Sequence, residues 1–117
     1  MRHHDKFKTL GREKGQRVSL VRSLVRSLII HEGITTTESK AKELRKYIEP
    51  MITTAKKNTL ASRRSLIASI DDEKAAKKLI EVVAPTMKTR MGGYTRVIKL
   101  PLRKSDGAKM AHIQFVK

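Results

Sequence analysis

Basic side chains are abundant in this chain, whereas the groups that catalysis requires are scarce. There is no cysteine, which excludes a thiolate nucleophile, a disulfide and a cysteine-type zinc site. No P-loop and no dinucleotide-binding glycine fingerprint is present. Asp71 and Asp72 are adjacent carboxylates, but acidic residues at a helix start far more often cap the helix. The sequence therefore predicts that the chain is not an enzyme.

The four histidines show no metal-site spacing. His3 and His4 are neighbours near the start of the chain, and no histidine pair has the helical spacing of a zinc motif. We expect His3 and His4 to contact phosphate or to be solvated. We predict neither a metal nor any other cofactor.

The net charge is the strongest functional signal. The chain has 27 Lys and Arg against 11 Asp and Glu in 117 residues, a formal charge of +16. Residues 1–30 carry eight basic and two acidic side chains and residues 86–117 eight and one, whereas residues 31–85 are closer to balance. Such a charge opposes compaction unless a polyanion neutralises it. Nucleic acid is the leading partner class, with anionic lipid second.

The first periodic segment predicts a helix over residues 17–31. Leu and Val recur there at three- and four-residue spacing, and Gly33 supplies the stop. Serines and the pair Arg22 and Arg26 lie on the opposite face. That face can approach a phosphate backbone closely, although an ordinary solvated helix face explains the two arginines equally well.

A second helix is expected to follow a short strand at residues 34–36. Thr35 and Glu38 have the spacing of a capping box, with Thr36 or Thr37 as alternative caps. Pro50 falls inside the apolar pattern of this helix. Because proline lacks an amide hydrogen, we expect either a kink or two abutting helices.

Two further helices complete the middle of the chain. The third follows Asn58 or Thr59 and exposes Arg63 and Arg64, and the fourth ends at Pro85. The positions expected to be buried are Leu60, Leu66, Ile67 and Ile70 in the third helix and Ala76, Leu79, Ile80 and Val83 in the fourth.

After Pro85 the pattern indicates extended structure. Residues 94–100 are rich in β-formers, and residues 111–115 alternate apolar and polar side chains. Asp106 and Gly107 mark the turn of the resulting hairpin, whose tip is basic. The predicted fold class is α+β, with helices packed on a small mixed or antiparallel sheet, a C-terminal hairpin and an extended basic N-terminal arm.

The length allows a single domain over residues 1–117. Residues 1–16 form the basic RNA-binding arm, residues 17–85 the helical core, and residues 86–117 a glycine–tyrosine turn and the hairpin. The longest apolar run is three residues, so no membrane insertion is expected. We also expect no secretion signal and no small-molecule substrate.

Five basic segments together predict a nucleic-acid surface: the arm, one face of the first helix, the Arg63 and Arg64 pair, residues 88–96 and the hairpin tip. Gly92 and Gly93 allow the main chain to approach a phosphate. A plain turn is the competing interpretation of this glycine pair.

Several strings of this sequence resemble the bacterial large-subunit ribosomal protein L-seventeen family. They are MRH at the start, Leu10–Gly11–Arg12, TTTESKAKELR at 35–45, EPMITTAK at 49–56, Arg63 with Arg64, and RMGGYTRVIKL at 90–100. The likeness covers essentially the whole chain. It implies a structural, non-enzymatic constituent of the large ribosomal subunit that supports translation in the cytoplasm. It also implies binding to 23S ribosomal RNA near the polypeptide exit tunnel, beside neighbouring large-subunit proteins.

The resemblance also implies RNA-contacting residues. Arg2, His3, Gly11 and Arg12 fall in the family's RNA-embedded arm, and Arg90, Gly92, Gly93, Tyr94 and Arg96 in its glycine–tyrosine turn. From the charge pattern we add Lys6, Lys8, Lys14, Arg17, Arg22, Arg26, Arg63, Arg64, Lys88, Arg103 and Lys104.

Two other classes compete with this interpretation. A DNA-binding module, or another basic nucleic-acid-binding module, is the alternative, but a helix-turn-helix reader would concentrate its basic side chains on one helix. A membrane-surface helix would need Trp or Phe on the apolar face of the first helix, which has neither.

Overall fold

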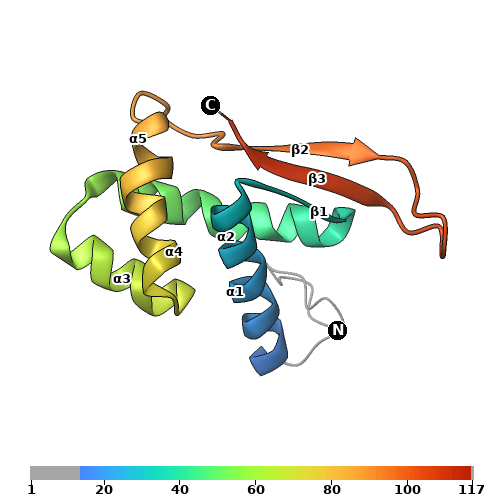
Figure 1. Ribbon diagram of the computed structural model, residues 1–117, viewed down its shortest axis with the longest axis horizontal. Helices are drawn as coiled ribbons and strands as arrows, with labels where there is room; N and C mark the ends of the chain where they lie inside the picture. Colours follow the sequence, from blue (N-terminus) through green and yellow to red (C-terminus); the bar gives the residue numbers. More distant parts are fainter. Residues whose placement is uncertain (1–13, 117) are drawn as a thin grey trace, which may run out of the picture.

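The computed structural model describes residues 14–116. Figure 1 shows helices packed beneath and beside a three-stranded sheet. In chain order the elements are α1 (Lys14–His31), β1 (Gly33–Thr37), α2 (Glu38–Lys57), α3 (Leu60–Ile70), α4 (Glu73–Lys78), the π-helical segment η1 (Leu79–Val83), α5 (Ala84–Thr86), β2 (Thr95–Leu100) and β3 (Met110–Phe115). The predicted α+β class is confirmed.

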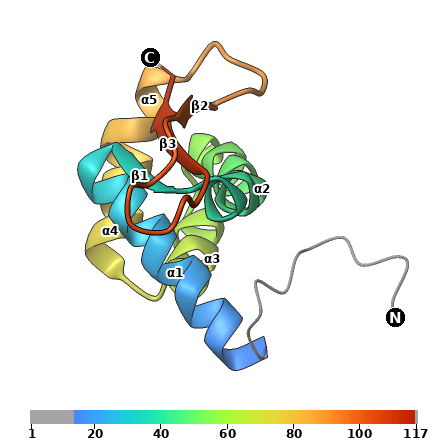
Figure 2. The same ribbon diagram turned by 90° about the vertical axis from the view of Figure 1, so that its right-hand side faces the viewer.

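The sheet is antiparallel, with β3 between β1 and β2. Val97 pairs with Ile113 and Ile113 with Ile34, so these three side chains share one face. That face packs on α2, which contacts all three strands. Viewed along the strands in Figure 2, α2 covers one side of the sheet. The other face carries Arg96 and Gln114 in register, and Arg96 is exposed there.

Helix α1 begins at Lys14, three residues before the predicted start. Its buried side chains are Val21, Val25, Leu28 and Ile29, all in its later turns, so the first two turns project from the core. Glu32, not Gly33, adopts the left-handed conformation that ends the helix, with φ at 63°. Gly33 has a steric role instead, because a Cβ there would lie 2.9 Å from Nε2 of His112.

The start of α2 differs from the predicted capping box. Thr37 is the N-cap residue and makes no side-chain cap hydrogen bond. The amide of Glu38 donates instead to the carbonyl of Lys109, at 2.9 Å. Thr35 lies in β1, and its hydroxyl is 3.0 Å from Nδ1 of His112. The neighbouring loop therefore supplies an acceptor that the local sequence could not reveal.

Pro50 does not split α2, so the alternative of two abutting helices is wrong. Ile48 and Ile52 on either side of the proline are fully buried in the same core. Their burial stabilises both halves of the helix enough to offset the hydrogen bond that proline cannot make.

In α3, the expected burial of Leu66 and Ile70 is confirmed, but Leu60 is 64% exposed and Ile67 38% exposed. Thr59 caps α3 through a capping box with Ser62, whose amide donates to the Thr59 hydroxyl at 3.1 Å. The side of α3 that faces the core is formed by Ser62, Leu66 and Ile70 at four-residue spacing, and Leu60 lies outside it.

Pro85 does not end the last helix, contrary to the prediction. The chain passes from α4 into η1, where the amide of Ala84 donates to the carbonyl of Leu79, and continues into α5 with Pro85 inside it. A π turn changes the hydrogen-bond spacing just before the residue that cannot donate. Ala76, Leu79, Ile80 and Val83 are all buried as predicted.

Candidate nucleic-acid interface

The structure describes part of the predicted RNA-contacting set. Arg2, His3, Lys6, Lys8, Gly11 and Arg12 lie outside the described residues. Lys14 belongs to the predicted arm and Arg17 follows it. Both lie in the first turn of α1. Neither side chain makes a hydrogen bond or ion pair with any residue of the 14–116 segment.

Arg22 and Arg26 have an internal role. Nε of Arg22 donates to the carbonyl of Ser69 at 3.2 Å, and Nε of Arg26 to that of Ile70 at 3.1 Å. These carbonyls end α3, where backbone acceptors lack helical partners and positive charge is favourable. The two arginines therefore join α1 to α3, and Arg26 is partly buried in doing so. Only Nη1 and Nη2 of each guanidinium are therefore available for the predicted contact with phosphate.

The arginine pair of α3 is divided between two roles. Nη2 of Arg63 lies 3.5 Å from Oε1 of Glu81, which links α3 to η1. Arg64 is exposed and has no hydrogen bond or ion pair within the described part of the chain. Arg64 is therefore the member of the pair that can meet an anion without losing an internal contact.

Residues 88–93 form an exposed loop that connects α5 to the sheet. Lys88, Arg90, Gly92 and Gly93 are all exposed, and Gly93 has φ at 61°, a left-handed conformation that favours glycine. A Cβ at Gly92 would meet nothing within 4 Å, so the main chain there is open to a large ligand. The geometry is compatible with the predicted phosphate approach.

Tyr94 is buried, unlike an RNA-stacking aromatic residue. Its amide donates to Oε2 of Glu49 at 2.6 Å, and its hydroxyl accepts from Thr53 at 3.5 Å and from Nζ of Lys56 at 3.2 Å. The hydrogen bond from Thr53, and to a smaller extent the one from Lys56, lowers the pKa of the Tyr94 phenol. Lys56 also donates to the carbonyl of Arg90. Tyr94 thus anchors the loop and does not present its ring to a partner.

Sequence reasoning missed the three α2 residues that hold this loop. Glu49, Thr53 and Lys56 are spaced by four and three residues, which places them on one face of α2. The sequence signal was limited to two quoted strings: all three residues lie in the 49–56 string, and residues 90–93 of the loop lie in the 90–100 string. The two strings contact each other in the folded chain.

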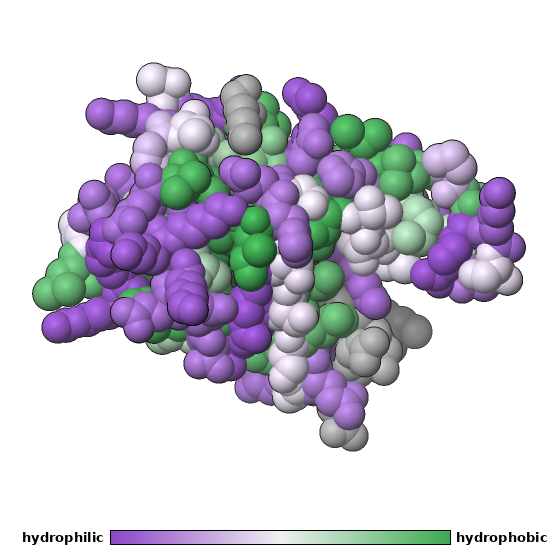
Figure 3. Space-filling view, viewed as in Figure 1, coloured by the Kyte–Doolittle hydropathy of each residue, from purple (hydrophilic) through white to green (hydrophobic). Residues whose placement is uncertain are grey.

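The hairpin tip is ordered by an ion pair. Nε of Arg103 donates to Oδ1 of Asp106 at 2.8 Å and Nη2 to Oδ2 at 2.6 Å. These bonds from Arg103, with the amide of Ala108, lower the pKa of Asp106 to about 2. Lys104 is exposed beside this pair and makes no hydrogen bond or ion pair with the described residues. In Figure 3 the end of the hairpin is covered mainly by hydrophilic side chains.

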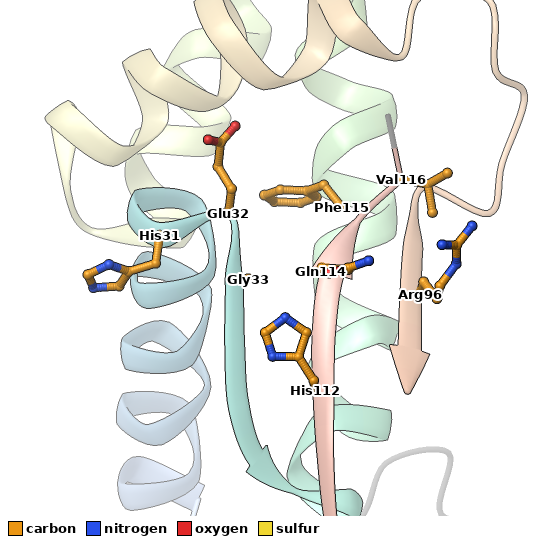
Figure 4. A pocket seen from close by; sticks show the side chains of 8 residues that line it. All are labelled: His31, Glu32, Gly33, Arg96, His112, Gln114, Phe115 and Val116. Carbon is orange, nitrogen blue, oxygen red and sulfur yellow. The ribbon is translucent and has the colours of Figure 1, made fainter. Parts of the chain in front are cut away.

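Arg96 contributes to a hollow of about 550 Å³ on the sheet face that carries Gln114 and His112 (Figure 4). Gln114 and His112 from β3 and the end of α1 line it with Arg96. The guanidinium, amide and imidazole groups are hydrogen-bond donors suited to phosphates or base edges. Glu32, an acidic residue, is also part of the lining of the hollow.

No helix in the 14–116 segment is long and apolar enough to cross a membrane. The same residues contain no group of three or more His, Asp or Glu side chains that could hold a metal ion.

Unpaired cations of the described residues thus lie on several elements of the fold. Known proteins are similar to this chain in sequence. Residues 20–116 match the family described as ribosomal protein L17. The chain belongs to the ribosomal protein L17 family. Relatives called large ribosomal subunit protein bL17 include that of Hydrogenobaculum sp. (strain Y04AAS1), 48% identical over the full length of both chains.

Other family members extend the similarity. The bL17 protein of Fusobacterium nucleatum subsp. nucleatum is 47% identical over 99% of this chain and 100% of its own, and that of Campylobacter concisus is 44% identical over 99% and 98%. The ribosomal protein L17 family consists of ribosomal structural proteins and not of enzymes. The predictions of a ribosomal protein, of no enzymatic activity and of a place within the cytoplasmic ribosome are confirmed at the family level.

Proposed function

We propose that this chain is a structural constituent of the large ribosomal subunit that binds and stabilises 23S ribosomal RNA near the polypeptide exit tunnel. Family membership supports the subunit, and the resemblance of the whole chain to that family supports the position at the tunnel. Neighbouring large-subunit proteins complete the set of proposed partners.

One observation carries the RNA-binding part of the proposal. Cations without an internal partner in the described residues are exposed or partly exposed on several elements of the fold. They are Lys14, Arg17, Arg64, Lys88, Arg90, Arg96 and Lys104 of the predicted set, and also Lys40, Lys57, Lys74 and Lys77. The acidic side chains instead lie mostly on the helices, where Glu38 pairs with Lys42 at 2.9 Å and Arg45 with Glu49 at 3.5 Å. Positive charge is therefore left over where a polyanion can reach it.

The distribution favours RNA shape and backbone recognition over base reading in duplex DNA. The unpaired cations of the described residues come from α1, α2, α3, α4, the 88–93 loop, β2 and the hairpin tip, and not from one helix. A helix that reads the major groove would concentrate them. Contacts spread over several elements suit a folded RNA that surrounds the protein.

Sedimentation of cell extract through a high-salt gradient tests this proposal. We expect the full-length chain to travel with the large ribosomal subunit, detected by an antibody. A chain that remains at the top of the gradient, or that travels with DNA instead, would overturn the proposal.

A further inference from the structure

We propose that a groove between α1 and α2 holds an unstacked nucleobase of the bound RNA, with the adjoining phosphates on the groove's basic rim. This inference rests on the proposed RNA-binding function and assigns a specific site to it.

The groove has a volume of about 400 Å³ and an apolar floor. Val18, Val21 and Val25 line it from α1, and Tyr47 and Met51 line it from α2. Val21 and Val25 are buried, but Val18 is 40% exposed, because the first two turns of α1 extend beyond the core. The floor is therefore partly open to solvent in the described structure.

The rim of the groove is basic. Lys14, Arg17 and Arg22 line it together with Ser69, and no carboxylate does among residues 14–116. Arg22 donates to the Ser69 carbonyl through Nε, which holds the guanidinium in place. Its Nη1 and Nη2 bond to no described residue. Lys14 and Arg17 have no partner in the described part either.

An apolar floor with three cations at its rim matches a nucleotide. Single-stranded RNA is recognised by bases that leave the stack and rest on aromatic or apolar side chains, and its phosphates bind Arg and Lys. A docked peptide would need acidic groups opposite three cations. The lining of the hollow on the sheet includes the acidic residue Glu32, whereas the described lining of the groove includes no acidic residue.

A matched pair of substitutions tests the site. Val18→Glu places a carboxylate in the groove, whereas Val82→Glu makes the same change at a residue that is 49% exposed on η1 and does not line the groove. We expect Val18→Glu to weaken binding of the full-length chain to purified 23S ribosomal RNA by about tenfold or more. Val82→Glu should remain within about twofold of the parent chain, since surface substitutions away from a site have small effects.

Zero-length ultraviolet crosslinking examines the base contact directly. Tryptic digestion of the irradiated complex releases residues 18–22 and 47–56 as separate peptides. We expect nucleotide adducts on at least one of them. Adducts found only on other peptides, or equal loss of affinity in Val18→Glu and Val82→Glu, would overturn the inference. If the parent chain itself does not bind 23S ribosomal RNA, the proposed function fails as well, which distinguishes the two failures.

Discussion

Among single residues, Tyr94 and its α2 partners determine where the exposed 88–93 loop lies. The ring of Tyr94 is buried against α2, and the ammonium of Lys56 lies 5.1 Å from the ring centroid. The family resemblance placed Tyr94 in the RNA-contacting turn, but sequence alone could not reveal that its side chain points inward. The neighbouring residues of that turn are exposed, namely Arg90, Gly92, Gly93 and Arg96.

Substitution of Tyr94 should separate its ring from its hydroxyl. Tyr94→Phe removes hydrogen bonds to Thr53 and Lys56 and should lower the free energy of unfolding by about 1 kcal/mol. Tyr94→Ala also removes the buried ring and should cost about 3 kcal/mol or more. Urea denaturation measures both values. An alanine variant as stable as the parent would contradict the anchoring role.

The ion pair between Arg103 and Asp106 should be lost in acid, when the Asp106 carboxylate takes up a proton. Because the folded-state pKa of Asp106 is lowered from its ordinary 3.8 to about 2, the contact favours the folded tip above about pH 4 and is lost as the pH falls through about 2. A titration of the Asp106 carboxyl carbon by nuclear magnetic resonance should give that value. Arg103→Gln is the control, and it should return the pKa toward 3.8. A parent chain that already titrates near 3.8 would contradict the ion pair.

For whole elements, local patterns predicted existence and approximate position well, but not how the ends are completed. The alternation of Ala111, Ile113 and Phe115 predicted a half-buried strand, and β3 has this pattern. At the start of α2 the alternative cap Thr37 is confirmed, but the Thr35–Glu38 capping box is wrong, because the amide of Glu38 donates to the carbonyl of Lys109, which is distant in sequence. Pro85 was misread because a π turn accommodates it. Periodicity reports local geometry, whereas these features depend on tertiary contacts.

Two threonine N-caps provide an element-level test. Thr59 caps α3 through its side chain, whereas Thr37 precedes α2 without a side-chain cap bond. Thr59→Ala should lower the free energy of unfolding by about 1 kcal/mol. Thr37→Ala, the matched control, should change it by about 0.5 kcal/mol or less. Equal losses in thermal denaturation would show that the capping box does not stabilise α3.

Across the whole molecule, the charge pattern indicated the partner class but not the role of each cation. The sequence could show that both ends are cationic and the middle nearly balanced. It could not show that Arg22, Arg26, Arg63 and Arg103 bond within the chain while Arg64 and Lys104 do not. That distinction depends on which carbonyls and carboxylates the fold brings near.

The salt dependence of binding to 23S ribosomal RNA tests the central claim most directly. If the chain neutralises on the order of ten phosphates, each contact should add roughly 0.7 to 0.9 to the slope of log affinity against log salt. Filter binding of the full-length chain should therefore lose about 10⁴- to 10⁵-fold in affinity between roughly 50 and 200 mM salt. An affinity that hardly changes over this range would contradict the account.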